Sequence, residues 1–314
     1  MNYRDRIHPD LLELYDSGAD FQFDFPDFVR NFLEEEFKTI GLPKCDSVQV
    51  TEQYISGKNG ENDIYIRIYR PSDSGIKPGL LWIHGGGYIG GLIKRDEGLC
   101  IRFANEAKCC VVSVEYHLAP EYPFPRPLDD CYSALTWFYN NAAELNVDKT
   151  RIAVAGNSAG GGLTAALSLY ARDHGGPPIF FQMPLYPMID DRCNSPSCIE
   201  MQDLRSWSYQ ANKIAWSMYL GNNTGNVSQY AAPARADDYS NLPPTYTCIG
   251  DLDPFRDETI EYVAMLSRAQ VPVEFHLYPG CFHGFDVSIV RTEIGDIAQT
   301  GYVEALAKAL RINR

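Results

Sequence analysis

Positive charge and long apolar runs are both scarce in this sequence. Its 314 residues include 27 Lys and Arg against 41 Asp and Glu, which gives a formal charge of −14. Such a chain repels phosphate backbones and anionic headgroups, so neither nucleic acid nor a membrane surface is expected as a partner. No run approaches the roughly 20 apolar residues of a membrane span, and no apolar stretch typical of a secretion signal follows the charged N-terminus. We therefore expect a soluble protein.

Paired cysteines of the kind that hold a metal ion are also missing. The nine cysteines are odd in number and irregular in spacing, and no C-x-x-C arrangement occurs. Cys281 and His283 could form half of a metal site, but no second pair stands nearby, so no metal is expected. Cys109 and Cys110 lie in an apolar run, where a free thiol behaves as a small hydrophobic group. Such free thiols are typical of a reducing compartment, and we expect a cytoplasmic protein.

Strands and helices alternate along most of the chain. Segment 64–69 alternates Ile with other residues, as in a half-buried strand, and short apolar runs such as 80–83 are typical of buried parallel strands. Strands joined by helices predict an α/β fold with a mostly parallel central sheet and helices on both faces. The predicted strands are 64–69, 80–83, 110–114, 152–155, 179–181, 246–249 and 273–278, and the predicted helices are 95–107, 159–172, 257–269 and 295–311.

Two segments depart from this alternation. Residues 1–45 are predicted to be helical, with Asp24 as the cap of a helix whose apolar residues recur at helical spacing. Residues 190–240 contain no clear strand, but they include a predicted helix at 208–220 and several bulky aromatic residues. We interpret this second segment as an insertion between two core strands. The predicted division of the chain is 1–45, a core of 46–189 and 241–314, and the insertion 190–240.

A nucleophile motif follows one of the predicted strands. Gly156-Asn157-Ser158-Ala159-Gly160 has the pattern G-x-S-x-G and leads from an apolar strand into a helix rich in Ala and Leu. Glycines on both sides of the serine remove side chains that would clash in so sharp a turn. The helix N-terminus beneath the serine favours developing negative charge. Ser158 is therefore predicted to be a nucleophile rather than an incidental serine in a tight turn.

A glycine-rich loop follows another predicted strand. His84-Gly85-Gly86-Gly87-Tyr88 leaves backbone N–H groups unobstructed, and no G-K-S/T follows that would indicate a phosphate-binding loop. Ester hydrolysis passes through a tetrahedral oxyanion that needs preorganised donors. Two N–H groups of this loop, together with that of Ala159, are predicted to form the oxyanion hole. The sequence leaves open which two of Gly85, Gly86 and Gly87 donate. His84 is predicted to support the loop.

Asp253 and His283 each follow a predicted strand and should lie at the same sheet edge as Ser158. The chain order Ser, Asp, His is that of α/β-hydrolases. In such a triad the histidine takes the serine proton and the aspartate orients the imidazole. Asp251 and Asp257 are the competing acids in the same loop. Asp253 is favoured because Pro254 holds it in an extended backbone conformation.

Together these motifs resemble the hormone-sensitive-lipase-like esterases, a bacterial group of α/β-hydrolases. The resemblance runs from about residue 45 to the C-terminus and implies a helical cap built from 1–45 and 190–240. It also implies hydrolysis of short- to medium-chain acyl esters without a cofactor. The family often has Asp where this chain has Asn157. The motifs that carry the resemblance are 84–87, 116–121 with 124–125, 156–161, 253–258 and 283–285.

The same resemblance suggests a substrate pocket and an oligomer. Bulky aromatic residues of the predicted cap would limit the depth of an acyl pocket. Family members with this nucleophile motif often form homodimers through a sheet edge, and the strand 273–278 is the expected edge. The predicted pocket residues are Tyr88, Trp207, Trp216, Tyr219 and Phe285.

Two other functions stay open on the sequence. A Ser-His-Asp triad could also cleave an amide, a formamide or a lactone, because acyl-transfer machinery is shared among these reactions. A non-catalytic small-molecule receptor is a second alternative, since the plant gibberellin receptor resembles this family. That receptor lacks the triad histidine, whereas this chain has His283. Release of fatty acids from long-chain triglycerides is not expected.

Overall fold

The computed structural model describes residues 3–18, 30–31, 45–58, 60, 63–223, 225–287 and 291–311. Within them, the N-terminal segment is helical, with two 3-10 turns, η1 (Tyr3–Arg6) and η2 (Pro9–Leu11), and one short helix, α1 (Leu12–Ser17). The helix predicted to begin after Asp24 lies outside the described residues.

A single sheet of eight strands forms the centre of the molecule, in the order β1-β2-β4-β3-β5-β6-β7-β8. The pairs β1·β2 and β2·β4 are antiparallel, and all other neighbours are parallel. The α/β-hydrolase fold predicted from the sequence is therefore confirmed. The strands are β1 (Val48–Ile55), β2 (Ile64–Pro71), β3 (Lys77–Ile83), β4 (Cys110–Glu115), β5 (Val147–Asn157), β6 (Phe181–Leu185), β7 (Thr245–Leu252) and β8 (Val273–Phe282).

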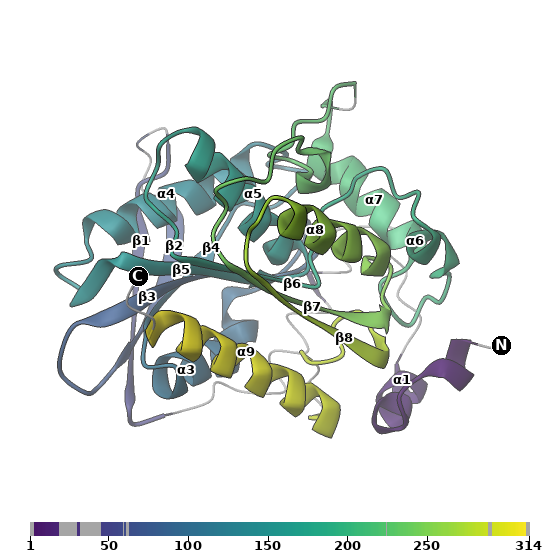
Figure 1. The fold of residues 1–314 in the computed structure, drawn as a ribbon, viewed down its shortest axis with the longest axis horizontal. Helices are drawn as coiled ribbons and strands as arrows, with labels where there is room; N and C mark the ends of the chain where they lie inside the picture. Colours follow the sequence, from purple (N-terminus) through teal and green to yellow (C-terminus); the bar gives the residue numbers. More distant parts are fainter. Residues whose placement is uncertain are drawn as a thin grey trace.

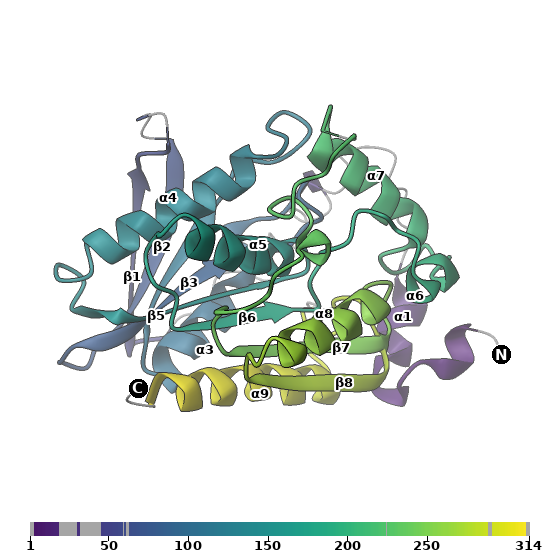
Figure 2. The ribbon, with the colours of Figure 1, turned by 45° about the horizontal axis from the view of Figure 1, so that its top comes forward.

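Helices cover both faces of the sheet, as Figure 1 shows. Helices α3 and α9 lie side by side on one face, while α4, α5 and α8 cover the other (Figures 1 and 2). Burial is nearly complete between these layers, and residues of β3 such as Leu80 and Trp82 have no exposed surface. The helices of this core are α3 (Glu97–Glu106), preceded by η3 (Ile93–Asp96), α4 (Arg126–Asn140), α5 (Ala159–Asp173), α8 (Arg256–Arg268) and α9 (Glu293–Arg311).

One strand and two α-helices of the structure were not predicted, and one strand was misplaced. Strand β1, helix α4 and the short helix α6 (Pro196–Glu200) are absent from the sequence prediction. The strand predicted at 179–181 begins only at Phe181 and continues to Leu185. Pro184 explains the error, because a proline inside a run argues against a central strand. Here Pro184 lies within a parallel strand all the same, and its carbonyl accepts a hydrogen bond of 2.5 Å from Thr247 Oγ1.

The parallel strands bring three distant segments of the chain to one edge of the sheet. Strand β5 ends at Asn157, β7 at Leu252 and β8 at Phe282. The residues that follow these ends are Ser158, Asp253 and His283. Parallel strands end at the same sheet edge, so the fold itself gathers these side chains.

Three described elements belong to the segment 190–240. They are α6, α7 (Tyr209–Leu220) and η4 (Pro233–Arg235), and no strand occurs among the described residues of the segment. Helices α6 and α7 stand at the end of the molecule toward which β7 and β8 point, and α1 lies on the same side (Figures 1 and 2). Tyr15 of α1 donates a hydrogen bond to Asp203, which joins the N-terminal segment to the residues after α6.

Candidate active site

Ser158 occupies the sharp turn between β5 and α5. Its φ of 54° is in the left-handed region, which a residue with a side chain adopts only under constraint. The flanking glycines explain how the turn is possible. A Cβ atom on Gly156 would lie 2.4 Å from the Ile83 carbonyl oxygen, and one on Gly160 would lie 2.1 Å from the same atom. The turn is therefore pressed against the end of β3, and only glycine fits at these two positions.

A continuous chain of hydrogen bonds links the serine to a buried acid. Ser158 Oγ lies 2.8 Å from His283 Nε2, and His283 Nδ1 lies 2.7 Å from Asp253 Oδ2. The second oxygen of Asp253 accepts a hydrogen bond of 2.8 Å from the backbone N–H of Phe255. Asp253 is 1% exposed, so its carboxylate is held by the imidazole and the backbone rather than by water. This arrangement can transfer a proton from a serine hydroxyl to a neutral histidine.

Aromatic rings surround the imidazole of His283. The ring centroids of Phe255 and Tyr186 lie 4.9 and 5.3 Å from that of His283, both nearly perpendicular to it, and that of Trp207 lies 6.3 Å away. Of these three, sequence analysis identified only Trp207. Tyr186 directly follows β6 with a φ of 33°, which is strained for a tyrosine. Because Pro184 hid the strand, its end was not recognisable as a site position.

The two competing aspartates have other partners. Asp251 Oδ1 accepts a hydrogen bond of 2.5 Å from the backbone N–H of Gly280 in β8. Asp257, in the first turn of α8, accepts from the backbone N–H of Ser197 at 2.8 Å and from Arg256 Nε at 2.9 Å. Both carboxylates thus hold backbone segments together, and only Asp253 contacts the histidine.

The glycine-rich loop lies directly against the nucleophile. A Cβ atom on Gly85 would come within 3.3 Å of Ser158 Cβ. Gly86 and Gly87 have φ values of 124° and 64°, and the carbonyl of Gly86 accepts the N–H of Gly90 at 2.9 Å. The N–H groups of Gly86, Gly87 and Ala159 make no hydrogen bond to another described residue. The structure therefore leaves backbone donors free on two sides of the serine.

His84 is buried and fixed at the start of this loop. Its Nδ1–H donates to the carbonyl of Gly85 at 2.8 Å, its Nε2 lies 3.3 Å from Glu115 Oε1, and its ring stacks on Tyr116 at 4.3 Å. Burial alone would lower the pKa of His84, but the hydrogen bond and charge of Glu115 outweigh it and raise the pKa above its usual value. Glu115, at the end of β4, is a loop-supporting residue that sequence reasoning missed.

Asn157 faces a buried carboxylate rather than water. The Asp96 carboxylate accepts a hydrogen bond of 2.8 Å from Trp82 Nε1 and another from the Asn157 side chain. Burial raises the pKa of Asp96, although these two donors oppose the effect. An aspartate at position 157 would place a second acid beside Asp96. The amide therefore suits this chain's own surroundings.

The predicted pocket residues fall into separate groups. Tyr88, Trp216 and Tyr219 form one buried cluster, in which the rings of Tyr88 and Tyr219 stack at 3.9 Å. Phe285 is also buried and packs against Tyr278. Trp207 lies against Gly87 of the glycine-rich loop, because a Cβ atom on Gly87 would lie only 2.4 Å from its ring.

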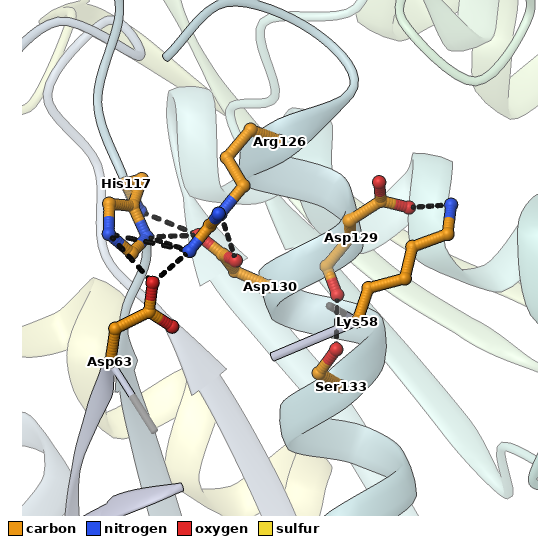
Figure 3. Close-up of polar contacts among 7 residues, drawn as sticks. All are labelled: Lys58, Asp63, His117, Arg126, Asp129, Asp130 and Ser133. Atoms are coloured by element: carbon orange, nitrogen blue, oxygen red, sulfur yellow. Dashed lines mark hydrogen bonds and ion pairs between the residues drawn. The ribbon is translucent and has the colours of Figure 1, made fainter. Parts of the chain in front are cut away.

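The motif at 116–121 belongs to a polar network outside the triad, shown in Figure 3. His117 Nδ1 lies 2.7 Å from Asp130 Oδ2, and Arg126 bridges Asp130 and Asp63 at 2.8 and 2.5 Å. Asp130 is 1% exposed and also accepts the backbone N–H of His117 at 2.9 Å. The network fastens the segment after β4 to the start of α4. Lys58, Asp129 and Ser133 lie beside it, with Lys58 Nζ 2.9 Å from Asp129 Oδ1.

Two further properties follow from the described residues. Among them there is no group of three or more His, Cys, Asp or Glu side chains arranged to hold a metal ion. In the same part of the chain, every helix is too short or too polar to cross a membrane.

Comparison with known proteins places this architecture in a family. Residues 80–287 match the model of the α/β-hydrolase fold family. The chain is 35% identical to the esterase LipI of Mycobacterium tuberculosis over 89% of this chain and 88% of that protein, and 38% identical to the carboxylesterase NlhH of the same organism over 74% and 75%. It also resembles the solved structure of a bacterial heroin esterase, with a TM-score of 0.93 and 36% identity over 99% and 100% of the two chains. The chain therefore belongs to the α/β-hydrolase family, in its hormone-sensitive-lipase-like branch, as its motifs predicted.

Proposed function

We propose that this protein is a serine carboxylesterase that hydrolyses short- to medium-chain acyl esters through an acyl-enzyme intermediate. The observation that carries the proposal is the hydrogen-bonded series from Ser158 through His283 to Asp253, with distances of 2.8 and 2.7 Å. The esterase names of its relatives support the same reaction. A receptor without catalytic activity would have no need of this series, so the histidine argues against the receptor alternative.

In the proposed acylation step, Ser158 Oγ attacks the carbonyl carbon of the ester while His283 Nε2 takes the serine proton. The resulting tetrahedral oxyanion collapses, the carbon–oxygen bond to the alcohol breaks, and His283 returns the proton to the leaving oxygen. Asp253 holds the imidazole and stabilises its cationic form. Water then attacks the acyl-enzyme by the same sequence, which releases the acid and regenerates Ser158.

We propose that the oxyanion hole is formed by backbone N–H groups of the segment Gly85–Gly87 and by that of Ala159. Support comes from the free N–H groups of Gly86, Gly87 and Ala159 and from the closeness of Gly85 to the serine. Such preorganised donors are most effective because they require no reorganisation as charge develops in the transition state. His84, held by Glu115, would keep the loop in place.

The substrate preference is proposed from the rings around the triad. Trp207 lies against both Gly87 and His283 and would form a wall of the pocket. Each buried methylene contributes about 0.8 kcal/mol until such a wall is reached. Trp207 would belong to a cap formed by the N-terminal helices and residues 190–240, which also contributes Trp216 and Tyr219 to the buried cluster around Tyr88. We further propose a cytoplasmic location, because all nine cysteines are free thiols.

The test is a series of p-nitrophenyl esters with increasing acyl length, assayed with the natural protein and with Ser158→Ala. We expect kcat/KM to peak at short to medium chains. Ser158→Ala should lose several orders of magnitude in kcat while its unfolding transition stays unchanged, because the removed hydroxyl contributes to the reaction rather than to packing. Activity of Ser158→Ala within tenfold of the natural protein would refute the nucleophile. A rate that rises without limit to very long chains would refute the bounded pocket.

A further inference from the structure

The thiols of Cys193 and Cys198 are both buried, close to the surface of the protein. Cys198 has no exposed surface and Cys193 is 5% exposed, but the residues on either side of Cys193, Arg192 and Asn194, are exposed. Asn212 Nδ2 of α7 lies 3.3 Å from Cys193 Sγ and 3.4 Å from Cys198 Sγ. The two thiols are also close enough for each to affect the pKa of the other. A single amide therefore holds both sulfur atoms at one point.

The backbone is shaped to make this pairing. Cys193 has a φ of 49°, which is unusual for a residue with a side chain and turns the chain back on itself. Ser195 then caps α6, with its Oγ accepting the backbone N–H of Cys198 at 3.2 Å. Neither feature is used by the proposed ester hydrolysis. A strained residue that brings two thiols together points to a role for the pair itself.

The surroundings make Cys198 the more reactive of the two. The hydrogen bond from Cys193 lowers the pKa of the Cys198 thiol, and Asn212 adds to this effect against the opposing effect of burial. The same pairing raises the pKa of Cys193. By contrast, burial raises the pKa of Cys248 and of Cys281. Since the thiolate is the nucleophile in thiol oxidation, Cys198 is the natural point of attack.

The pair is also connected to the loop that carries the proposed catalytic acid. Ser197, the neighbour of Cys198, donates its backbone N–H to Asp257 at 2.8 Å and its hydroxyl to the carbonyl of Pro254 at 2.9 Å. The Ser197 Oγ in turn accepts the backbone N–H of Asp257 at 3.0 Å. Pro254 directly follows Asp253. Through Ser197, a movement of Cys198 would therefore act on Pro254 and Asp257, two residues that follow the acid in the chain.

We propose that Cys193 and Cys198 are a modification site at which a small hydroperoxide forms a reversible intramolecular disulfide, and that this disulfide slows the esterase. The Cys198 thiolate attacks one peroxide oxygen, the O–O bond breaks, and a sulfenic acid and water form. The Cys193 thiol then attacks the sulfenic sulfur and releases a second water. In sum, two thiols and one hydrogen peroxide give one disulfide and two waters. An external dithiol reverses the reaction by exchange.

The loss of rate follows from the contacts of Ser197. Drawing the two sulfur atoms into a covalent bond must change the turn at Cys193 and shift the start of α6. Because a displacement of about 1 Å in a catalytic group can cost up to 100-fold in rate, we expect oxidation to lower kcat about tenfold. This effect on rate depends on the proposed ester hydrolysis, whereas formation of the disulfide does not.

The test treats the folded, full-length protein with hydrogen peroxide, blocks remaining thiols by alkylation, and maps tryptic peptides by mass spectrometry. Both cysteines lie in the peptide 193–205, since no Lys or Arg separates them. We expect this peptide to lose two hydrogens and to resist alkylation until dithiothreitol is added. Ester hydrolysis by the same samples should fall and then recover with the reductant. A peptide that stays reduced and fully alkylated would overturn the modification site.

Cysteine variants distinguish oxidation at this site from oxidation of other residues in the protein. Cys193→Ser and Cys198→Ser should each abolish the peroxide effect on rate, and Cys45→Ser, which removes a more exposed thiol, should keep it. Disulfide formation without a change in rate would overturn the connection to the acid loop. If the natural protein cleaves no ester even when reduced, the proposed function fails, and the mass measurement still decides whether the disulfide forms.

Discussion

At the scale of single residues, three aspartates between the end of β7 and the start of α8 bind different partners through their carboxylates. Only Asp253 reaches the imidazole, while Asp251 and Asp257 bind the backbones of Gly280 and Ser197. We expect Asp253→Asn to lower kcat by about four orders of magnitude, because an amide no longer fixes the correct imidazole tautomer. Asp257→Asn should keep most of the activity and cost about 1 kcal/mol of stability at the start of α8.

Steady-state kinetics and urea unfolding of the two variants distinguish these roles. The assignment fails if Asp253→Asn stays active while Asp257→Asn, still folded, does not.

A different acid, Asp286, makes stability depend on pH. It is 6% exposed, receives a hydrogen bond of 3.2 Å from Tyr186, and keeps its Oδ1 without a partner among the described residues. Burial raises its pKa to about 6. Between about pH 4 and 6, Asp286 keeps its proton in the folded protein but loses it in the unfolded chain. The free energy of unfolding therefore falls as the pH rises through this window. The penalty at neutral pH is on the order of 3 kcal/mol.

Asp286→Asn should remove this dependence. The free energy of unfolding should change little at pH 4 and increase by about 1–3 kcal/mol at pH 8 relative to the natural protein. Urea unfolding followed by circular dichroism at the two pH values measures the difference. An equal effect of the substitution at both pH values would contradict the raised pKa.

At the scale of elements, the junction of β5 and α5 is built against the end of β3. A methyl group on Gly160 would lie 2.1 Å from the carbonyl oxygen of Ile83 and 2.5 Å from that of His84. Neither backbone atom can move without breaking the sheet, so Gly160→Ala should cost about 3 kcal/mol or more. Gly225→Ala is the matched control, because no atom lies within 4 Å of its new methyl group.

Thermal unfolding compares the two alanine variants. A Gly160→Ala melting temperature equal to that of Gly225→Ala would show that the junction is looser than the contacts imply.

At the scale of the whole molecule, β8 ends the sheet and pairs only with β7 among the described strands. Leu277 on this strand is 43% exposed, and Ile297 of the neighbouring α9 is 53% exposed. An unpaired strand edge with apolar side chains is a template for association. We propose that two copies pair through β8 into a homodimer.

Light scattering at micromolar concentration should give twice the mass of the chain, and the variant Leu277→Pro should give the mass of the monomer. A monomeric natural protein would refute the proposal.

Local sequence determined much of this protein. The strand-turn-helix around Ser158 is predictable because the glycines at 156 and 160 allow a tight turn between an apolar strand and a helix. The parallel sheet follows from the alternation of apolar strands with helices. The positions of Asp253 and His283 in the sequence were enough to predict that they lie near the serine, since each directly follows the end of a parallel strand.

Tertiary structure alone decided the partners of these residues. Tyr186 and Phe255 stand against His283, Glu115 holds His84, and Asn212 joins Cys193 to Cys198. Each of these contacts connects residues on different elements, and periodicity along a single segment carries no information about them. The separation of Trp207 from the buried cluster of Tyr88, Trp216 and Tyr219 has the same cause, because an aromatic residue in an insertion can pack inward or line a pocket with the same local pattern.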